Sequence, residues 1–212
     1  MSDSTLPAVT GVVLAGGRAS RMGGVDKGLV EVADQAMVDH VLARLGAQTS
    51  RLIINANRNE AEYRQRGYPV VADRFGSYAG PLAGMAAGLA AAATPWVVTV
   101  PCDSPLVPPD LVARLWQGLG DHEAQLAVAW AEGRMQPVFA LLPRDLLPDL
   151  EAFLESHGRK IDQWYARHHT AVVDLSDHPE AFVNINTPED RSAMAARLQD
   201  QGSEAARGEP HE

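Results

Sequence analysis

The chain has 212 residues, 46% of them hydrophobic and 21% charged, which is ordinary for a globular protein; this length suits one α/β domain that buries about 70% of its unfolded surface. Its net charge of −9 argues against a general nucleic-acid binder, because such proteins need a basic face. Its one cysteine excludes an intramolecular disulfide and a multi-cysteine metal or iron–sulfur site, and no apolar run reaches the ~20 residues that cross a bilayer.

Apolar runs of strand type alternate with helical patterns along the chain. This order predicts an α/β protein with three α/β/α layers, Rossmann-like, in which a mostly parallel sheet is covered on both faces. Glu132-Gly133 is typical of a turn, so the runs that flank it suggest one antiparallel strand. The expected strands are residues 9–15, 51–55, 69–72, 96–100, 127–130, 138–142, 170–174 and 182–185.

Helices are expected at 36–45 and 81–93, after Pro108-Pro109, and at 145–157, where Gly158 takes the C-cap position. Residues 1–198 are expected to form a single domain, and residues 199–212, which are polar and lack periodicity, a disordered tail. The first seven residues carry no basic region, which favours a cytoplasmic, unprocessed protein.

The most informative segment is the first strand with the loop behind it, residues 12–27, which read VVLAGGRASRMGGVDK. Glycines let the backbone approach a phosphate closely and point amide N–H groups at it. Arg21 and Lys27 from the same loop can balance the charge of a nucleoside triphosphate and of a departing pyrophosphate. The segment therefore predicts a triphosphate site at the end of a parallel strand.

Other motifs fit this segment less well. A Walker loop needs Ser or Thr after Gly-Lys, whereas Lys27 follows Asp26 and precedes Gly28. The dinucleotide fingerprint needs Gly-x-Gly-x-x-Gly, which Gly16-Gly17 does not supply. A plain glycine-rich turn with two solvated cations remains the structural alternative.

Two polar residues follow the next two predicted strands. Open parallel sheets bind ligands beyond the C-terminal ends of their strands, which is where Asn55 and Asp73 fall. The Asn55 amide can read a base edge or a ribose hydroxyl, or it only caps the next helix. Asp73 can accept hydrogen bonds from a base or a ribose, or it only fixes the loop that follows.

The strand at 96–100 runs into Pro101-Cys102-Asp103. Asp103 suits Mg²⁺, which takes one or two protein carboxylates together with phosphate and water; the alternative is an Asx turn before Pro105. Cys102 has no histidine arrangement to support a nucleophilic role, so we expect a small core residue.

Asn184 and Asn186 are two positions apart near the C-terminus. Because side chains of an extended segment point alternately to its two faces, these two amides are expected to lie on one face. They could hold a polar second substrate. Thr187-Pro188 with Asp190 is typical of a helix N-cap, so those residues are interpreted as structural.

These separated segments together resemble one enzyme family. LAGG followed by SRMGG-x-DK, then N-A-N-R at 55–58, GPLAG at 80–84 and F-V-N-I-N-T-P-E at 182–189, is similar to the molybdenum cofactor guanylyltransferases. The resemblance covers residues 10 to 192 and implies the nucleotidyltransferase version of the fold. It also implies catalytic roles for Arg21, Lys27 and Asp103, with Mg²⁺ on Asp103, and pterin binding by Asn184 and Asn186. The implied GTP-binding residues are Leu14, Ala15, Gly16, Gly17, Lys27, Asn55, Asp73, Gly84 and Asp103.

The implied reaction is attack by the phosphate of molybdopterin on GTP, which forms the guanine dinucleotide cofactor and releases pyrophosphate. Molybdenum-insertion proteins and acceptor molybdoenzymes or their chaperones are the implied partners, with no role for nucleic acid or membrane. Related cytidylyltransferases tend to carry LAAG, so Gly16, which stands where they have the second alanine, favours the larger purine. A cytidylyltransferase acting on molybdopterin or another small phosphorylated substrate, and a non-catalytic nucleotide-binding protein that delivers the cofactor, are the alternatives.

Overall fold

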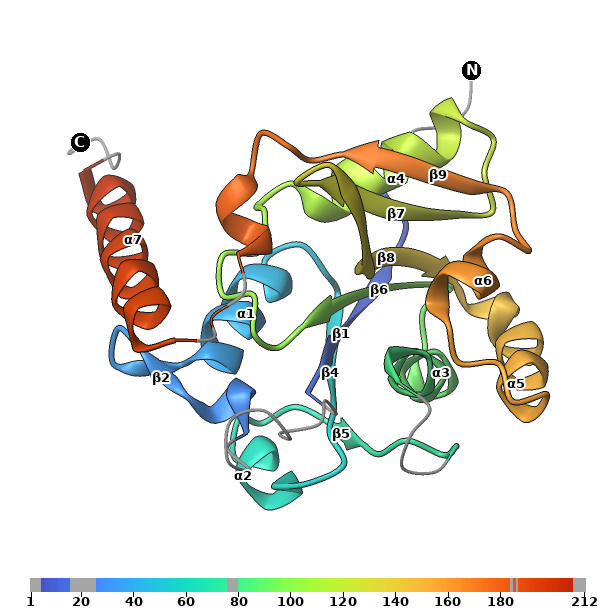
Figure 1. Cartoon of the computed structure of the whole chain (residues 1–212), viewed down its shortest axis with the longest axis horizontal. Helices are drawn as coiled ribbons and strands as arrows, with labels where there is room; N and C mark the ends of the chain where they lie inside the picture. The colour runs from blue at the N-terminus through green and yellow to red at the C-terminus, as the bar shows by residue number, and fades with distance from the viewer. Residues whose placement is uncertain (1–4, 16–25, 76–79, 184, 186, 208–212) are drawn as a thin grey trace.

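A seven-stranded sheet forms the centre of the molecule in a computed structural model that describes residues 5–15, 26–75, 80–183, 185 and 187–207. The strands lie in the order β5-β4-β1-β6-β8-β7-β9 (Figure 1). Their bounds are β1 Val9–Leu14, β4 Arg51–Asn55, β5 Val70–Val71, β6 Trp96–Pro101, β7 Leu126–Ala131, β8 Arg134–Pro143 and β9 Thr170–Asp174.

The direction of the strands confirms the predicted sheet. β1 pairs in parallel with β4 and β6, β4 with β5, and β7 with β9, whereas β8 is antiparallel to both of its neighbours. The turn between β7 and β8 contains Glu132 and Gly133, with φ of 53° and 72°. Positive φ at two successive residues is the geometry of a tight hairpin, which explains why Glu132-Gly133 reverses the chain.

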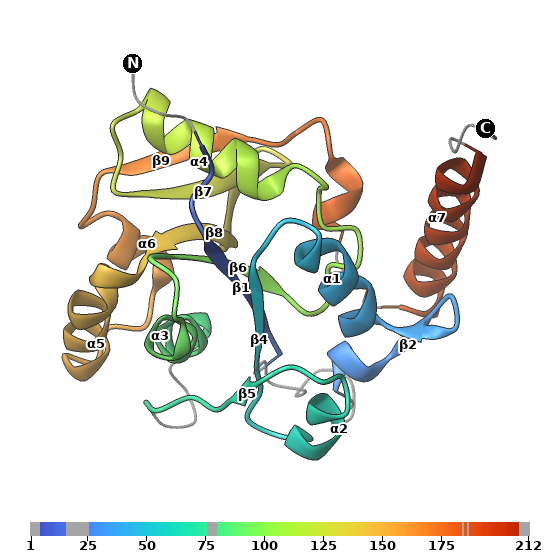
Figure 2. The same cartoon turned by 180° about the vertical axis from the view of Figure 1, so that it is seen from behind.

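Helices cover both faces of the sheet, as the sequence predicts (Figures 1 and 2). α1 (Met37–Gly46) and α4 (Leu111–Asp121) pack into one hydrophobic cluster, and α3 (Pro81–Ala91), α5 (Leu147–Glu155) and α6 (Ile161–Tyr165) pack into the cluster on the other face. The remaining elements are η1 Lys27–Leu29, β2 Glu31–Val32, β3 Gln35–Ala36, α2 Glu60–Arg64, η2 Arg144–Leu146, η3 Pro179–Phe182 and α7 Pro188–Arg207.

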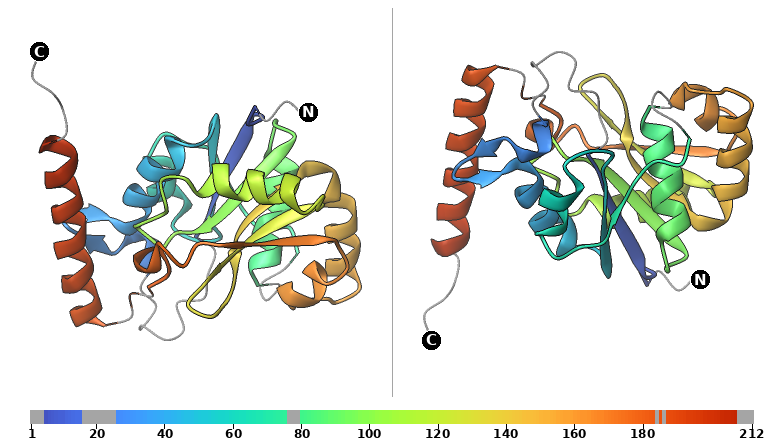
Figure 3. Two further views of the ribbon diagram at one scale, coloured as in Figure 1. Left: turned by 90° about the horizontal axis from the view of Figure 1, so that it is seen from above. Right: turned by 90° about the horizontal axis from the view of Figure 1, so that it is seen from below.

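The last helix, α7, lies at one edge of the molecule beside the β2–β3 hairpin (Figure 3). Met194 of α7 joins Val32, Met37, Leu106 and Ile185 in a small third cluster. Its start confirms the predicted cap: Thr187 Oγ1 accepts from Asp190 N at 3.1 Å, and Asp190 Oδ2 accepts from Thr187 N at 2.9 Å.

Two local predictions are wrong. Residues 182–185 were expected to be a strand, but Phe182 ends the 3-10 helix η3, whose first residue is Pro179, and Val183 and Ile185 are in no strand. Gly158 was expected to cap α5, but the left-handed residue is His157, with φ of 64°.

The C-terminal segment also differs from the expected pattern, because α7 extends to Arg207 and so into the expected tail at 199–212. Residues 208–212 lie outside the described part of the chain. Within the described residues, no helix has both the length and the apolar character that spanning a membrane requires.

Candidate active site

Four parallel strands end at one edge of the sheet and deliver the predicted site residues to it. Leu14, the last residue of β1, is in register with Asn55 of β4 and Pro101 of β6. Asn55 is in register with Val71, the last residue of β5. Asp73 and Asp103 follow β5 and β6 by two residues each, so both carboxylates emerge at this edge.

The backbone just beyond β1 is fixed from both sides. Ala15 N donates to the carbonyl of Asn55 at 2.7 Å, and Cys102 N donates to the carbonyl of Leu14 at 3.1 Å. Leu14 and Ala15, which the resemblance names as nucleotide contacts, therefore lie at this edge of the sheet. Gly16, Gly17 and Arg21 lie outside the described residues.

Lys27 and Asp103, which the sequence assigns to the phosphates and the metal, lie together. Lys27 Nζ is 3.5 Å from Asp103 Oδ2, and their side chains are 31% and 23% exposed. Half-buried charges interact more strongly than fully solvated ones, because less water screens them. A cation and a carboxylate at this edge suit binding of a polyphosphate with its metal ion.

Asp73 receives hydrogen bonds from two asparagines at the end of β4, Asn55 in the strand and Asn57 just after it. Its Oδ1 accepts from Asn55 Nδ2 at 2.8 Å, and its Oδ2 accepts from Asn57 Nδ2 at 2.7 Å. Asn57 Oδ1 in turn accepts from Asp73 N at 2.7 Å. Asn55 does not cap the next helix, because the residue before α2 is Asn59. The sequence analysis assigned no role to Asn57, although it lies in the N-A-N-R segment.

Gly84 makes room for this arrangement. A Cβ atom at Gly84 would lie 2.3 Å from Asn55 Oδ1 and 3.1 Å from Leu14 Cδ2. Asn55 is 2% exposed, so its amide is enclosed between α3 and the ends of the strands. Gly88, one turn later, instead faces Val12 in the core.

A further carboxylate, Asp26, was missed as a functional candidate. It is 6% exposed and lies next to Lys27 in the chain. Its partners Arg58, Asn59 and Tyr63 come from α2 and the loop before it. No local pattern identifies these contacts, since they join residues 32 to 37 positions apart.

The donor set at Asp103 fits Mg²⁺. Mg²⁺ prefers oxygen ligands and usually takes one or two carboxylates, with substrate phosphates and water completing the octahedron. Within the described part of the chain, no three His, Cys, Asp or Glu residues group as a metal cage. A half-buried single carboxylate beside the expected triphosphate site therefore suits an ion that arrives with its nucleotide.

Cys102, the residue before Asp103, packs in the hydrophobic core, which agrees with the prediction of a small core residue. It is 8% exposed. Burial raises the pKa of its thiol above the ordinary value, and the negative charges of Asp103 and Asp26 raise it further. A thiol held neutral is a poor nucleophile.

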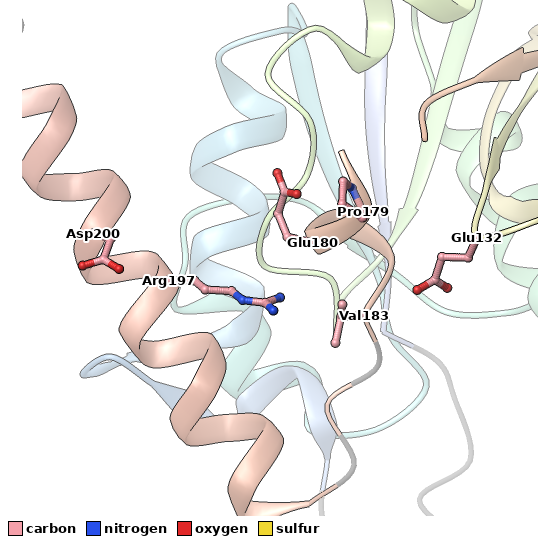
Figure 4. Close-up of a pocket in the computed structure, with 6 residues that line it drawn as sticks. All are labelled: Glu132, Pro179, Glu180, Val183, Arg197 and Asp200. Carbon is pink, nitrogen blue, oxygen red and sulfur yellow. The ribbon is translucent and has the colours of Figure 1, made fainter. Parts of the chain in front are cut away.

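A pocket of about 400 Å³ lies between η3, α7 and the β7–β8 turn (Figure 4). Arg197 extends from α7 toward Glu180, and Glu132 faces the same space from the opposite side. The lining contains three carboxylates, from Glu132, Glu180 and Asp200, and only the one guanidinium of Arg197, so the pocket disfavours a phosphate. Val183 lines it, but the predicted pterin-binding residues Asn184 and Asn186 lie outside the described residues.

Comparison of the sequence with known proteins identifies a family. A model of the MobA-like NTP transferase domain matches residues 11–172. The protein named molybdenum cofactor guanylyltransferase of Shewanella loihica is 47% identical over 192 residues, which are 91% of this chain and 98% of that protein.

Two solved structures share the fold at low identity. Molybdopterin-guanine dinucleotide biosynthesis protein A from Archaeoglobus fulgidus has a TM-score of 0.74 at 20% identity, covering 90% of this chain and 99% of that one. A 4-diphosphocytidyl-2C-methyl-D-erythritol synthase from Anaerococcus prevotii has a TM-score of 0.70 at 14% identity, covering 91% and 96%. At these identities the likeness shows the nucleotidyltransferase fold alone.

Proposed function

Because this chain belongs to the MobA-like NTP transferase family, we propose that it transfers GMP from GTP to the phosphate of molybdopterin and releases pyrophosphate. The observation that carries the proposal is the pair of Lys27 Nζ and Asp103 Oδ2, 3.5 Å apart where the parallel strands end. The 47% identity to a relative named for this activity, over nearly the whole of both chains, supports the choice of substrates.

The reaction joins two phosphates, and this determines what the side chains must do. The attacking phosphate monoester oxygen is already anionic, so no general base is required. It forms a bond to the α-phosphorus of GTP while the bond to the β-phosphate oxygen breaks, and the electron pair leaves with pyrophosphate. Catalysis then depends on alignment and on stabilising the negative charge that develops.

Lys27 supplies part of that charge stabilisation in this proposal. Its ammonium lies at the strand edge, where it can contact the phosphates of GTP and the leaving pyrophosphate. Arg21 is proposed for the same task on sequence grounds. Asp103 would hold Mg²⁺, which when bound polarises the phosphoryl oxygens and neutralises charge on the leaving group.

The carboxylate of Asp73 is proposed to bind the nucleoside. Asn55 and Asn57 each donate one hydrogen bond to it, which fixes its orientation and leaves further lone pairs. Those lone pairs can accept from guanine N–H groups or from ribose hydroxyls. Asn184 and Asn186 stay proposed pterin contacts, and a cytoplasmic location with hand-over to insertion proteins and acceptor enzymes stays a prediction from the sequence.

Pyrophosphate release tests this function directly. The full chain is incubated with molybdopterin, Mg²⁺ and either GTP or CTP, and then with EDTA in place of Mg²⁺. We expect pyrophosphate release with GTP and not with CTP, and we expect EDTA to abolish this release and added Mg²⁺ to restore it. Release with CTP and not with GTP would show that the chain is a cytidylyltransferase. Tight binding of GTP without release of pyrophosphate would favour the non-catalytic protein that delivers the cofactor.

Asp103→Asn is the variant that tests the proposed metal ligand, and Asp39→Asn is its matched control. Asp39 is also a half-buried carboxylate in an ion pair, with Arg66 Nε at 2.8 Å, but it lies on α1. We expect at least about 100-fold slower release from Asp103→Asn and near-normal release from Asp39→Asn, since one lost electrostatic contact to a transition state costs this much.

A further inference from the structure

Asp26 is a buried carboxylate directly before the proposed catalytic lysine. Its side chain is 4% exposed. Removing an ionised carboxylate from water is costly unless opposite charge and hydrogen bonds compensate for the lost hydration. A residue with only a space-filling role would not need this charge, so the groups around Asp26 indicate what it does.

Both oxygens of Asp26 are engaged. Oδ1 accepts from Tyr63 Oη at 2.7 Å and from Gly28 N at 3.3 Å. Oδ2 accepts from Asn59 Nδ2 at 3.0 Å and lies 3.4 Å from Arg58 Nε. The carboxylate thus connects η1, which begins at Lys27, to α2 and the loop before it.

Tyr63 is more deeply buried than Arg58 and Asn59. It is fully buried in the cluster that includes Ile54 and Cys102. Burial raises the pKa of its phenol, and the electrostatic influence of Cys102 and the hydrogen bond to Asp26 raise it further. The hydroxyl therefore stays protonated and donates to Asp26.

The residue after Lys27 is held just as closely. A Cβ atom at Gly28 would lie 2.5 Å from Tyr63 Oη and 3.0 Å from Cys102 Sγ. Cys102 precedes Asp103, so the backbone next to Lys27 packs against the side chain of the residue next to Asp103. Lys27 is fixed between Asp26 and Gly28, and both contact the same phenol.

We propose that Asp26, held by Tyr63 and Asn59, is a positioning residue that fixes the backbone of Lys27 so that its ammonium meets Asp103 and the nucleotide phosphates. The inference rests on the proposed function for the role of Lys27. It assigns to the buried network a specific effect on one side chain, whereas a general effect on stability would follow from any buried hydrogen bond.

The first variant is Tyr63→Phe, with Tyr165→Phe as matched control. Tyr165 is also buried, and its hydroxyl donates to the carbonyl of Pro137 at 2.7 Å on the other face of the sheet. Both variants lose one buried hydrogen bond. Only Tyr63→Phe is expected to slow turnover, by about 10-fold, because small misplacements of a catalytic group are costly.

The second variant is Asn59→Gly, which is expected to fold. Asn59 is exposed and has φ of 50°, a conformation that glycine adopts freely. The change removes one donor to Asp26 without straining the backbone. A smaller loss of turnover than in Tyr63→Phe is expected, about 3-fold, since Oδ1 keeps its partners.

Nuclear magnetic resonance of ¹³Cε-labelled lysine reports on Lys27 without turnover. The chain has two lysines, Lys27 and Lys160, so Lys160 serves as internal reference. We expect Tyr63→Phe and Asn59→Gly to shift the Lys27 signal and its response to GTP, and to leave Lys160 unchanged. Tyr165→Phe should shift neither.

Unchanged Lys27 signals in both variants, with turnover equal to that of Tyr165→Phe, would overturn the positioning role. Absence of pyrophosphate release from the unmodified chain would instead refute the proposed function, and the resonance comparison would still decide whether Asp26 and its partners set the position of Lys27.

Discussion

A Cβ atom added to Gly84 would lie 2.3 Å from Oδ1 of Asn55, a separation that no real Cβ contact tolerates. The first turn of α3 and the end of β4 thus approach each other through a residue without a side chain. Since Asn55 Nδ2 donates to Asp73, the position of α3 determines how the proposed nucleoside ligand is oriented.

Gly84→Ala is therefore expected to weaken GTP binding although alanine is the better helix former by about 1 kcal/mol. The new methyl group must displace the Asn55 amide, which disturbs its hydrogen bond to Asp73. We expect the dissociation constant for GTP, measured by isothermal titration calorimetry, to rise about 10-fold, the equivalent of one lost hydrogen bond to a charged group.

Gly88→Ala is the matched control on the same helix. Its Cβ would lie 2.8 Å from both Cγ atoms of Val12, in the core. This variant should lose stability in urea unfolding and keep its affinity for GTP. An equal loss of affinity in both variants would mean that Gly84 acts only through helix packing.

Most strands of the main sheet were predictable because each contains an apolar run. β8, however, begins at Arg134, before its predicted start at 138, and the short strands β2 and β3 were not predicted. Arg51–Asn55 and Thr170–Asp174 agree residue for residue with the prediction, and the turn at Glu132-Gly133 gave the antiparallel strand. Residues 182–185 show the limit of the method. Phe182 is buried beside Phe139 through a 3-10 turn, and Ile185 is buried against α7, so their apolar character reflects two packing sites and not a strand.

The candidate site was predictable where a residue ends or closely follows a strand: Asn55 ends β4, and Asp73 and Asp103 follow β5 and β6. It was not predictable where a side chain acts through partners distant in sequence. Asp26 depends on Tyr63, 37 residues away, and its local neighbours give no sign of burial. The short elements η1 and α2, which bring these residues together, were also not predicted.

Lys27→Ala should separate catalysis from stability. Its ion pair with Asp103 is 31% and 23% exposed, and pairs of this kind contribute about 0–1 kcal/mol. The transition state, by contrast, loses a positive charge beside the leaving pyrophosphate. We expect turnover to fall more than about 100-fold with little change in the free energy of unfolding.

Arg64→Ala is a suitable comparison, because Arg64 forms an exposed ion pair with Glu60 at 2.7 Å outside the site. It should retain full turnover. Full activity of Lys27→Ala, or its failure to fold, would count against a catalytic role for the lysine.

Asn57→Ala tests the exposed side of the Asp73 network. Asn57 both donates to Asp73 Oδ2 and accepts from Asp73 N, so its loss frees the carboxylate on one side while Asn55 still holds the other. We expect the KM for GTP to rise about 3- to 10-fold at nearly constant kcat, because the hydrogen bonds that orient Asp73 for the nucleotide lose about 1 kcal/mol. A fall in kcat at unchanged KM would place Asn57 in the chemical step instead.

The buried thiol of Cys102 should make the folded chain less stable at alkaline pH. Because burial raises its pKa in the folded state, the unfolded chain loses this proton first as pH rises. The contribution of the neutral thiol to the free energy of unfolding should therefore be fully present below about pH 8.5. Above that pH the free energy of unfolding should fall by up to about 1.4 kcal/mol per pH unit. Urea unfolding between pH 7.5 and 9.5 (about one unit either side of that value) measures this slope.

Cys102→Ala should remove that part of the slope. Ellman's reagent gives an independent check on the single thiol, which should react slowly in the folded chain and quickly in urea. Rapid reaction of the native chain at neutral pH would show that the thiol is accessible and ionised.

His157 ends α5 in a conformation that favours glycine. Its φ is 64°, His157 N donates to Leu154 O at 3.1 Å, and Gly158 N donates to Phe153 O at 2.9 Å, which together form a Schellman motif. Holding a non-glycine residue in the left-handed region destabilises the folded chain by about 1–2 kcal/mol. Glycine avoids this strain but loses more conformational entropy on folding, which offsets part of the gain. His157→Gly should therefore raise the free energy of unfolding by about 0.5–1 kcal/mol.

Two neighbouring substitutions make this prediction specific to the left-handed position. Ser156, with φ of −74°, is equally exposed but right-handed, so Ser156→Gly should destabilise the chain. Gly158→Ala should also destabilise it, because a Cβ there would lie 2.5 Å from the Phe153 ring. Stabilisation by Ser156→Gly as well would show that the helix end responds to flexibility in general and not to the φ of His157.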